Sequence, residues 1–306
     1  MEAIEEALEG LGHSSVRIPF TRDLHIFTER FKEQAVDIVF NLCETVDEAP
    51  YLVWHAAAVF ELLGVSFTGS TSVGLMLSTD KLVSKRLLKG RQIRTPKYIV
   101  YNGSLEFTTA LLKFPVIIKP RFEDASIGID QDSIFENDQE LRKGLKKFLD
   151  RFGPVLIEEY IPGREFNITL LGYPTASILP IGEIDFSAFP KNLYPIVGYR
   201  AKWDKASFEY HHSPRRFPQD LGRSLANKMQ RVALECFHLL MVRDYGRIDL
   251  RVDDQGKIYV LEVNGNPCLS PDAGFAASAQ ESGLTYGDMI GMIVDFAVQR
   301  EEGSTL

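Results

Sequence analysis

The sequence predicts a fold of mixed α/β and α+β class that divides into two or three lobes. Its 306 residues are 45% hydrophobic, which is enough for a sizeable core and for more than one lobe. Strand and helix patterns alternate over residues 36–69, and this order favours a parallel sheet covered on its faces. Further along the chain, residues 245–267 instead predict an antiparallel hairpin.

Composition and motifs exclude several classes of protein. The net charge of −8 argues against a general nucleic-acid binder, and no apolar run reaches the roughly 18 residues that span a bilayer. Cys43, Cys236 and Cys268 show neither a disulfide framework nor metal-site spacing, which fits a reducing compartment. The chain contains no Walker A or GxGxxG sequence. We therefore expect a cytoplasmic protein without nucleic-acid or membrane partners.

The first lobe is expected to hold a small parallel sheet. Residues 1–11 predict a helix with one apolar stripe. Residues 36–42 and 65–69 predict strands, separated by a helix over 51–63 that Gly64 closes. The chain thus opens on a helix, whereas a doubly wound sheet usually opens on a strand.

The rest of the chain mixes helices with strands. In order, the patterns predict a helix over 79–88, strands over 98–101 and 114–120, a helix over 138–152, strands over 155–161 and 165–171, one strand or a pair over 178–186, and a helix over 219–240. After the hairpin, a turn over 269–274 leads into residues 275–280, and 285–299 is the final helix.

Two segments point to a bound anion, although each also has an ordinary structural explanation. Lys119 ends a predicted strand, and in the loop that follows, Ala125, Ser126 and Gly128 let backbone N–H groups approach phosphate oxygens. A lysine at a strand end commonly just extends toward solvent. Residues 199–218 hold five basic residues against two acidic ones, which indicates either a solvated loop or a mobile lid that closes on an anion.

The hairpin over 245–267 is expected to have one apolar and one polar side. We place a two-residue turn at Gln255 and Gly256 and pair the residues across it. Side chains alternate between the two faces of a strand, so one side of the ribbon is apolar. That side is formed by the pairs Val252–Tyr259, Leu250–Leu261 and Ile248–Val263.

The polar side of the hairpin pairs Asp249 with Glu262 and Arg247 with Asn264. Cross-strand Cβ atoms lie about 5 Å apart, and two carboxylates this close repel each other unless a cation or a shared proton intervenes. Carboxylate and amide oxygens suit a hard divalent ion such as Mg2+, usually with phosphates completing its shell. The other explanation is a solvent-exposed face with ordinary strand charges.

Five ordered motifs resemble those of the ATP-grasp ligases, and most closely those of the D-alanine–D-alanine ligase group. They are TDK…K, VIIKP with its small-residue loop, LIEEYIPGREF, YRAKW, and GRIDL…LEVNGNP, and the resemblance runs from about residue 36 to the C-terminus. It implies an ATP-grasp fold, in which two α+β subdomains clasp ATP, preceded by a truncated N-terminal lobe with a parallel sheet. We accordingly expect a lobe at 1–78 that lacks its first strand, a small subdomain at 79–157 and a large subdomain at 158–306.

The resemblance also implies a nucleotide site with ATP as the cofactor. Lys81 and Lys119 are similar to the two lysines that reach the ATP phosphates, with Ser126 in the phosphate loop beside them. Glu165 is similar to the acid on the ribose hydroxyls, and Lys202 to the lid lysine on the triphosphate. The hinge around adenine is implied at Glu158, Glu159, Tyr160 and Ile161.

The metal site and the reaction follow from the same resemblance. Asp249, Glu262 and Asn264 are similar to the ligands of two Mg2+ ions, for which Mn2+ is a substitute, and this agrees with the hairpin pairing. Arg247 is similar to the arginine that steadies the oxyanion of the reaction centre, and Lys202 would share its catalytic role.

In the implied reaction, ATP converts a carboxylate into an acyl phosphate, and an amine then displaces the phosphate to form an amide or peptide bond. ADP and phosphate are released. The expected partners are small-molecule carboxylate and amine substrates, with amino acids foremost, and a homodimer is left open.

The sequence departs from the family pattern at the positions that bind substrate. A glutamate and a first strand near the start of the chain have no counterpart, Ala125 replaces a serine of the phosphate loop, and Trp203 replaces a lid tyrosine. The second amino acid usually meets a serine–leucine pair, where this chain has Asp272-Ala273-Gly274. These departures keep three alternatives open: a ligase for a different amino acid or peptide, a kinase-like phosphotransferase, and a catalytically impaired nucleotide-binding module.

Overall fold

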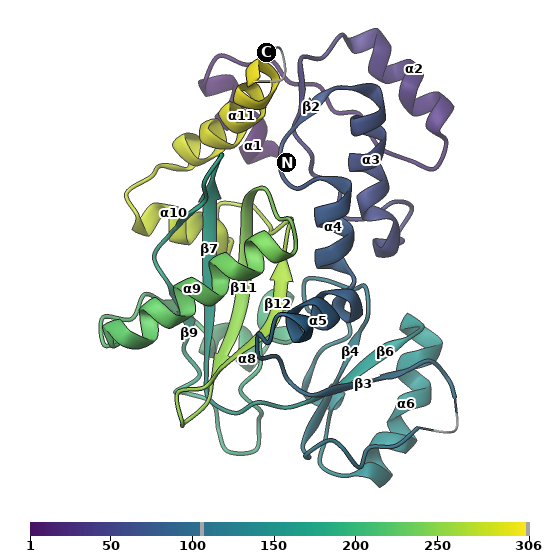
Figure 1. Cartoon of the computed structure of the whole chain (residues 1–306), viewed down its shortest axis with the longest axis vertical. Helices are drawn as coiled ribbons and strands as arrows, with labels where there is room; N and C mark the ends of the chain where they lie inside the picture. Colours follow the sequence, from purple (N-terminus) through teal and green to yellow (C-terminus); the bar gives the residue numbers. More distant parts are fainter. Residues whose placement is uncertain (105–106, 304–306) are drawn as a thin grey trace.

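The structure is a computed structural model that describes residues 1–104 and 107–303. Its strands form three separate sheets of two, four and six strands. In Figure 1 the N-terminal lobe lies at the top, the six-stranded sheet in the middle and the four-stranded sheet at the lower right. Within the described ranges, no helix is both long and apolar enough to cross a membrane.

The N-terminal lobe contains a parallel sheet as predicted, but its strands are short. Its elements are α1 (Glu2–Gly10), α2 (Leu24–Gln34), β1 (Ile38–Val39), η1 (Pro50–Leu52), α3 (Val53–Leu63), β2 (Ser66–Phe67) and α4 (Ser72–Thr79). β1 and β2 pair over two residues each, which is less than the expected strands over 36–42 and 65–69. The ladder ends because the backbone N–H of Asn41 donates to the hydroxyl of Thr68 (3.0 Å) and not to a strand carbonyl.

The helix expected over 79–88 follows directly after another helix, which the sequence patterns missed. Its observed bounds are Lys81–Gly90 (α5), and Asp80 separates it from α4. The carboxylate of Asp80 accepts hydrogen bonds from the backbone N–H groups of Leu82 (3.0 Å) and Val83 (3.2 Å). An aspartate in this position is a helix N-cap, because it satisfies donors that have no partner inside the helix. The cap places Lys81 at the first position of α5.

The four-stranded sheet is antiparallel and has a helix on one face. Its elements are β3 (Tyr98–Tyr101), β4 (Val116–Pro120), η2 (Gln131–Ser133), β5 (Ile134–Phe135), α6 (Asp138–Phe152) and β6 (Val155–Glu159). The strand order is β3-β6-β4-β5, and α6 covers the sheet through Leu141, Leu145 and Phe148. β6 continues to Glu159 and therefore spans the expected boundary between residues 157 and 158.

The hairpin belongs to the six-stranded sheet, whose order is β10-β9-β7-β11-β12 with β8 paired to β7. The elements of this region are β7 (Arg164–Gly172), β8 (Ser177–Ile178), β9 (Gly182–Ile184), α7 (Tyr199–Trp203), α8 (Phe208–His212), β10 (Arg215–Arg216), α9 (Arg223–Leu239), β11 (Asp244–Val252), β12 (Ile258–Asn264), α10 (Gly274–Glu281) and α11 (Tyr286–Gly303). α9 covers the face that carries Ile248 and Leu250, whereas α10 and α11 pack near Tyr245 on the opposite face. The expected strand or pair over 178–186 is a pair, and residues 199–218 contain two short helices and a short strand.

A β-bulge divides the hairpin into two registers. Asp249 pairs with Glu262, as predicted, whereas Leu250 pairs with Val260 and not with Leu261. Leu261 is therefore the extra residue that a bulge inserts into one strand. The predicted pairs between the bulge and the turn, Leu250–Leu261 and Val252–Tyr259, are wrong by one residue. The pairs on the other side of the bulge are correct: Ile248–Val263, Asp249–Glu262 and Arg247–Asn264.

The turn explains this shift, because it contains three residues and not two. The backbone N–H of Asp253 donates to the carbonyl of Lys257 (3.1 Å), and Gly256 has a φ of 73°. A three-residue hairpin loop commonly has its last residue in this left-handed region, which suits glycine. Val252 consequently does not face Tyr259. The bulge compensates for the longer turn and restores the register at Asp249 and Glu262.

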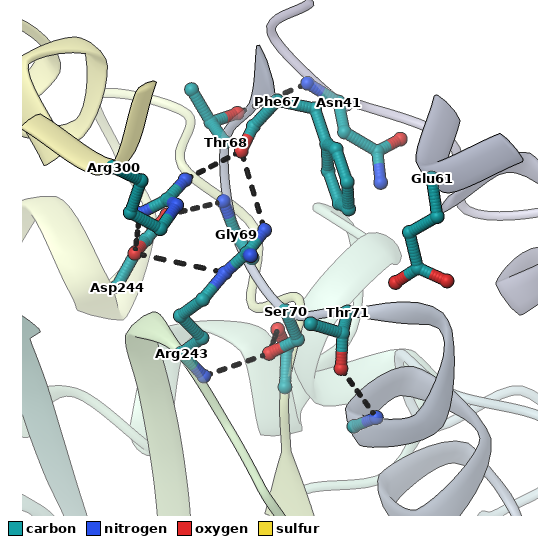
Figure 2. Close-up of polar contacts among 12 residues, drawn as sticks. Asn41, Glu61, Phe67, Thr68, Gly69, Ser70, Thr71, Arg243, Asp244 and Arg300 are labelled. Atoms are coloured by element: carbon teal, nitrogen blue, oxygen red, sulfur yellow. Dashed lines mark hydrogen bonds and ion pairs between the residues drawn. The ribbon is translucent and has the colours of Figure 1, made fainter. Parts of the chain in front are cut away.

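A buried ion pair joins the N-terminal lobe to the start of β11. Asp244 is 1% exposed, and its carboxylate accepts hydrogen bonds from the backbone N–H of Gly69 (2.8 Å) and from Arg300 of α11. The adjacent Arg243 donates to the carbonyl of Gly69 at 2.7 Å. Figure 2 shows these groups around the loop that follows β2. The contact ties the N-terminal lobe to the strand that carries Arg247 and Asp249.

Asp244→Asn is expected to lower the free energy of unfolding by about 3 kcal/mol, because it leaves the half-buried side chains of Arg243 and Arg300 without their buried carboxylate. Asparagine tolerates the left-handed backbone of this position (φ 64°), so the loss reports the charge and not backbone strain. Urea unfolding followed by circular dichroism measures the change, with the exposed Asp254→Asn as the control. Equal stability of the two variants would contradict the role of Asp244.

Candidate nucleotide and metal site

Asp249 lies on β11 and is held by two side chains. Arg247, two residues earlier and therefore on the same face, donates to both carboxylate oxygens from Nε (2.8 Å) and Nη2 (2.9 Å). Asn167 on the neighbouring strand β7 donates to Oδ1 at 2.7 Å. Burial opposes the charge, but Asp249 raises the pKa of Arg247, so the guanidinium group stays ionised. The geometry fixes one carboxylate of the predicted metal site.

Glu262 on β12 is held by a lysine from a different part of the chain. The Nζ of Lys81, at the start of α5, lies 2.7 Å from Oε1 of Glu262, and the lysine side chain is 5% exposed. Lys81 also contacts the carbonyl of Glu123 and, at 3.3 Å, Asp124 Oδ1. Burial alone would raise the pKa of Glu262, but Lys81 lowers it to about 2. The sequence predicted Lys81 at the phosphates, whereas here it neutralises a predicted metal ligand.

The residues predicted to bind Mg2+ fit that ion in their chemistry. Asp249 and Glu262 face each other, and among the described residues the side-chain oxygen of Asn264 accepts one hydrogen bond, from the N–H of Asn266 (3.0 Å). Oε1 of Glu262 is buried and has an ion pair but no hydrogen bond of good geometry. In the described part of the chain no three His, Cys, Asp or Glu residues converge on one point. A metal here would therefore be held by two carboxylates and an amide, as hard cations accept.

Glu158 is fully buried and lies between two lysines. Its Oε1 lies 3.1 Å from Nζ of Lys85, and its Oε2 lies 3.3 Å from Nζ of Lys119. Lys85 also donates to Thr95 Oγ1 (2.8 Å) and the carbonyl of Leu261 (3.3 Å). Burial lowers the pKa of Lys85, and Glu158 opposes that effect. We did not identify Lys85 from the sequence, although its position four residues after Lys81 on one helix face was a usable signal.

Arg251 organises the end of the predicted adenine hinge, and sequence reasoning missed it as well. It is 2% exposed and donates to Oε2 of Glu165 from Nη2 (2.7 Å) and Nε (3.1 Å). Its Nη1 donates to the hydroxyl of Tyr160 (3.1 Å) and to the carbonyl of Ile161 (2.8 Å). Arg251 lies on the same face of β11 as Asp249, so strand alternation was the signal that could have identified it.

One predicted hinge residue is directed elsewhere. Oε1 of Glu159 accepts a hydrogen bond from the backbone N–H of Lys113 (2.9 Å) and lies 3.9 Å from Nζ of Lys97. The carboxylate of Glu159 thus has partners outside the hinge, and the place of Glu159 in the adenine hinge stays a prediction. Its neighbour Glu158 points inward because successive side chains of a strand face opposite ways.

The segment predicted as a lid lies on the predicted phosphate loop. Ala125 and Ser126 both have left-handed backbones (φ 53° and 63°). The indole N–H of Trp203 donates to the carbonyl of Ala125 (2.9 Å), and the hydroxyl of Ser126 donates to the carbonyl of Val197 (2.7 Å). Ser126, which was expected at the phosphates, thus has its hydroxyl on Val197, two residues before the predicted lid segment. Both contacts hold the two segments together.

Lys202 of α7 faces the polar side of the hairpin. Burial and the charge of Arg247 lower the pKa of Lys202, whereas Asp249 and Glu262 oppose that effect. No carboxylate of the described residues forms an ion pair with Lys202, which distinguishes it from Lys81 and Arg247. Most of the charged residues that were predicted for the site therefore lie around one face of the hairpin.

In the ATP-grasp fold, two sheets meet around a site that is lined by cations. A D-alanine–D-alanine ligase from Bacillus anthracis, solved in complex with ATP, has this fold, with a TM-score of 0.72 and 21% identity. The superposition covers 92% of this chain and 86% of that protein. The fold class predicted from the sequence is confirmed.

The sequence comparisons narrow this class to one family. The family described as "D-ala D-ala ligase C-terminus" matches residues 97–295. The y4sG protein of Sinorhizobium fredii, whose name states no activity, is 30% identical over 99% of this chain and 88% of its own length. The D-alanine–D-alanine ligase of a Thermotoga strain is 31% identical over 98% of this chain and 92% of its own length. The chain belongs to the D-alanine–D-alanine ligase family of ATP-grasp ligases, as its motifs indicated.

Glu262→Gln is expected to lower the free energy of unfolding at neutral pH by about 3 kcal/mol, because Lys81 then stays buried beside a neutral amide. The folded-state pKa of Glu262 lies below its ordinary value of 4.5. Its contribution is therefore complete above that pH and is lost as the pH falls toward 2.

The measurement is urea unfolding of the parent and the variant at neutral pH and near pH 3. The difference between the two proteins should shrink at the lower pH. The exposed Glu281→Gln serves as the control and should match the parent at both values. A difference that does not change with pH would show that the ion pair with Lys81 does not provide the stability.

Proposed function

We propose that the chain is an ATP-dependent ligase that joins a carboxylate to an amine through an acyl phosphate. The observation that carries the proposal is the opposition of Asp249 and Glu262 on one hairpin face, with Arg247 and Lys81 neutralising them. Lys202 supplies a further cation at the same face. Phosphoryl transfer depends on such positioning and charge neutralisation, and the protein itself forms no bond to the phosphoryl group.

The nucleotide would lie between the two larger sheets. Lys119 and Lys202 would bind its phosphates, and the backbone of the loop at Ala125 and Ser126 would approach them. Both hydrogen bonds that Arg251 donates to Glu165 go to Oε2, and no described residue bonds to Oε1, which would accept a ribose hydroxyl. The hinge at residues 158–161 would read adenine through backbone groups, because the carboxylates of Glu158 and Glu159 already have partners.

Asp249, Glu262 and Asn264 would hold two Mg2+ ions, with Mn2+ as a substitute. The ions supply charge neutralisation for the transferring phosphoryl group. Lys81 then keeps Glu262 ionised until the metal arrives with the nucleotide. Arg247, already fixed by Asp249, presents a guanidinium group to the oxyanion that develops when the amine attacks.

The lid segment would keep water away from the acyl phosphate. Trp203 of this segment bonds to Ala125 of the phosphate loop, and Ser126 of that loop bonds to Val197 just before the segment. An active site that is closed to water protects a reactive intermediate from hydrolysis. The bonds must open for nucleotide entry, so this joint would move during each catalytic cycle.

The relatives are named D-alanine–D-alanine ligases, and an amino acid is therefore the proposed class of substrate. Two hydroxyl groups that the family uses for the first substrate are absent at Ala125 and Trp203. The indole N–H of Trp203 is also already bonded to Ala125. We propose that this pocket accepts a carboxylate substrate bulkier than D-alanine.

The test is a product screen by mass spectrometry with ATP, Mg2+ and pooled L- and D-amino acids. A new amide product and equal amounts of ADP and phosphate are expected. Lys119→Ala should lower phosphate release about 100-fold, because it removes a charged donor aimed at the phosphates. The exposed Lys143→Ala is the matched control and should keep the parent rate.

Two results would contradict the proposal. ADP formation with a stable phosphorylated product and no amide would identify a phosphotransferase. No consumption of ATP with any pool would identify a binding module without catalysis. Efficient formation of D-alanyl-D-alanine would keep the ligase and refute the bulkier substrate.

A further inference from the structure

Lys85 is a buried cation of the site region that has no role in the proposed function. It lies on α5, one turn after Lys81, and is 2% exposed. Its Nζ donates to Thr95 Oγ1 (2.8 Å) and to the carbonyl of Leu261 (3.3 Å), and it lies 3.1 Å from Oε1 of Glu158. An ammonium group has three N–H donors, and three protein oxygens surround this one. Lys85 therefore has no donor left for a nucleotide.

Glu158 is the anion that Lys85 shares with Lys119. Its side chain is fully buried, with Oε1 facing Lys85 and Oε2 lying 3.3 Å from Nζ of Lys119. Neither oxygen has a hydrogen bond of good geometry to the described residues, so both contacts are ion pairs. Burial opposes the charge of Glu158, but Lys119 and Lys85 together lower its pKa, so the carboxylate stays ionised. Two ammonium groups thus hold one buried carboxylate.

The three charges leave one positive charge uncompensated, and the contacts show where it lies. Among the described residues, Glu158 is the only partner of Lys119, whose side chain is 12% exposed near the end of β4. Lys85, in contrast, is surrounded by three oxygens and lies out of reach of solvent. Lys119 therefore presents the uncompensated charge and keeps N–H donors for a ligand.

Lys85 is also fixed by the six-stranded sheet. Leu261 is the bulge residue of β12, and Thr95 donates to the carbonyl of the adjacent Val260 (2.8 Å). Glu158, on the other side of Lys85, belongs to β6 of the four-stranded sheet. In Figure 1, α5 lies between β12 and the four-stranded sheet. Both sheets thus set the position of the ammonium group, and no bound ligand is needed for this.

We propose that Lys85 is a positioning residue that neutralises Glu158, so that the charge of Lys119 remains available for the nucleotide phosphates. The inference rests on the proposed function, in which Lys119 binds these phosphates. It adds a residue that acts through Lys119 and does not touch the nucleotide.

The physical reason is competition between two anions for one ammonium group. Coulomb attraction is stronger in a buried site than in water. Without Lys85, Glu158 and Lys119 would form a neutral pair, and the carboxylate would compete with the phosphates for Lys119. Removal of the charge of Glu158 as well would end this competition. The effect of Lys85 on phosphate binding should therefore depend on Glu158.

A lysine with a purely structural role would behave differently. If Lys85 only joined α5 to β12 through Thr95 and Leu261, its loss would weaken the binding of ligands with and without phosphates alike. Neutralising Glu158 would then restore nothing. The two roles can therefore be distinguished by comparing two ligands and two variants.

The experiment compares a non-hydrolysable ATP analogue with adenosine. Their dissociation constants are measured by calorimetry in the presence of Mg2+, the one for adenosine by displacement of the analogue. The ratio of the adenosine constant to the analogue constant reports the phosphates, because contacts to the base and the ribose cancel. Lys85→Met should lower this ratio at least about 10-fold, which corresponds to the loss of one hydrogen bond to a charged group.

Two further variants separate the charge balance from the structural role. The double variant that combines Lys85→Met with Glu158→Gln removes both charges and should bring the ratio back toward the parent value. It has no buried carboxylate that lacks a cation, so it still provides the test if Lys85→Met alone does not fold. The exposed Lys89→Met on the same helix is the matched control and should keep the parent ratio.

The outcomes separate this inference from the proposed function. A parent-like ratio in Lys85→Met, or a double variant whose ratio stays low, overturns the inference. If Lys119→Ala lowers the ratio in the same series, the proposed nucleotide site remains, whereas an unchanged ratio in Lys119→Ala overturns both. A ratio that Lys85→Met lowers and the double variant restores supports the inference even where the product screen finds no amide, a result that overturns the ligase alone.

Discussion

The opposition of Asp249 and Glu262 on adjacent strands is the constraint on which the rest of the site depends. Two carboxylates at cross-strand distance repel each other, and the fold relieves this with a different cation for each, Arg247 and Lys81. Arg247 comes from the same strand, but Lys81 comes from a helix whose first residue is set by the Asp80 cap. A local repulsion thus requires a contact between distant parts of the chain.

The same principle of compensated buried charge recurs around the site. Glu158 is shared by Lys85 and Lys119, and Glu165 is bound by Arg251, so these charges have partners before any nucleotide is present. Removing one partner of a buried ion pair typically lowers the free energy of unfolding by about 3–5 kcal/mol. These pairs therefore hold each side chain in place. Lys202 is an exception, because none of the described carboxylates forms an ion pair with it. A phosphate of the nucleotide would supply its partner.

Strand alternation alone predicted the polar face of the hairpin, because a period of two fixes which residues point together. The pairing of Asp249 with Glu262 was correct even though the turn was assigned two residues where it has three, since the bulge at Leu261 cancels that error. A bulge has no strong local signature, so the sequence could not show it. The register was therefore predicted correctly at the site and incorrectly beyond it.

Contacts between segments that are distant in the chain could not be predicted from the sequence. Motif similarity identified Lys81 and Glu165 but not that Glu262 and Arg251 would be their partners. The contact of Glu158 with both Lys85 and Lys119 likewise joins residues from three separate segments. Such features depend on tertiary packing, because they join residues that no local pattern relates.

The most direct measurement of the central claim follows oxygen from the carboxylate substrate. If the site activates a carboxylate with ATP, a substrate labelled with 18O in its carboxylate must transfer one labelled oxygen to each inorganic phosphate released. Mass spectrometry of the phosphate detects this transfer. The account predicts labelled phosphate in step with amide formation. Unlabelled phosphate would show that water attacks the nucleotide directly, and would contradict an acyl phosphate at the Asp249–Glu262 site.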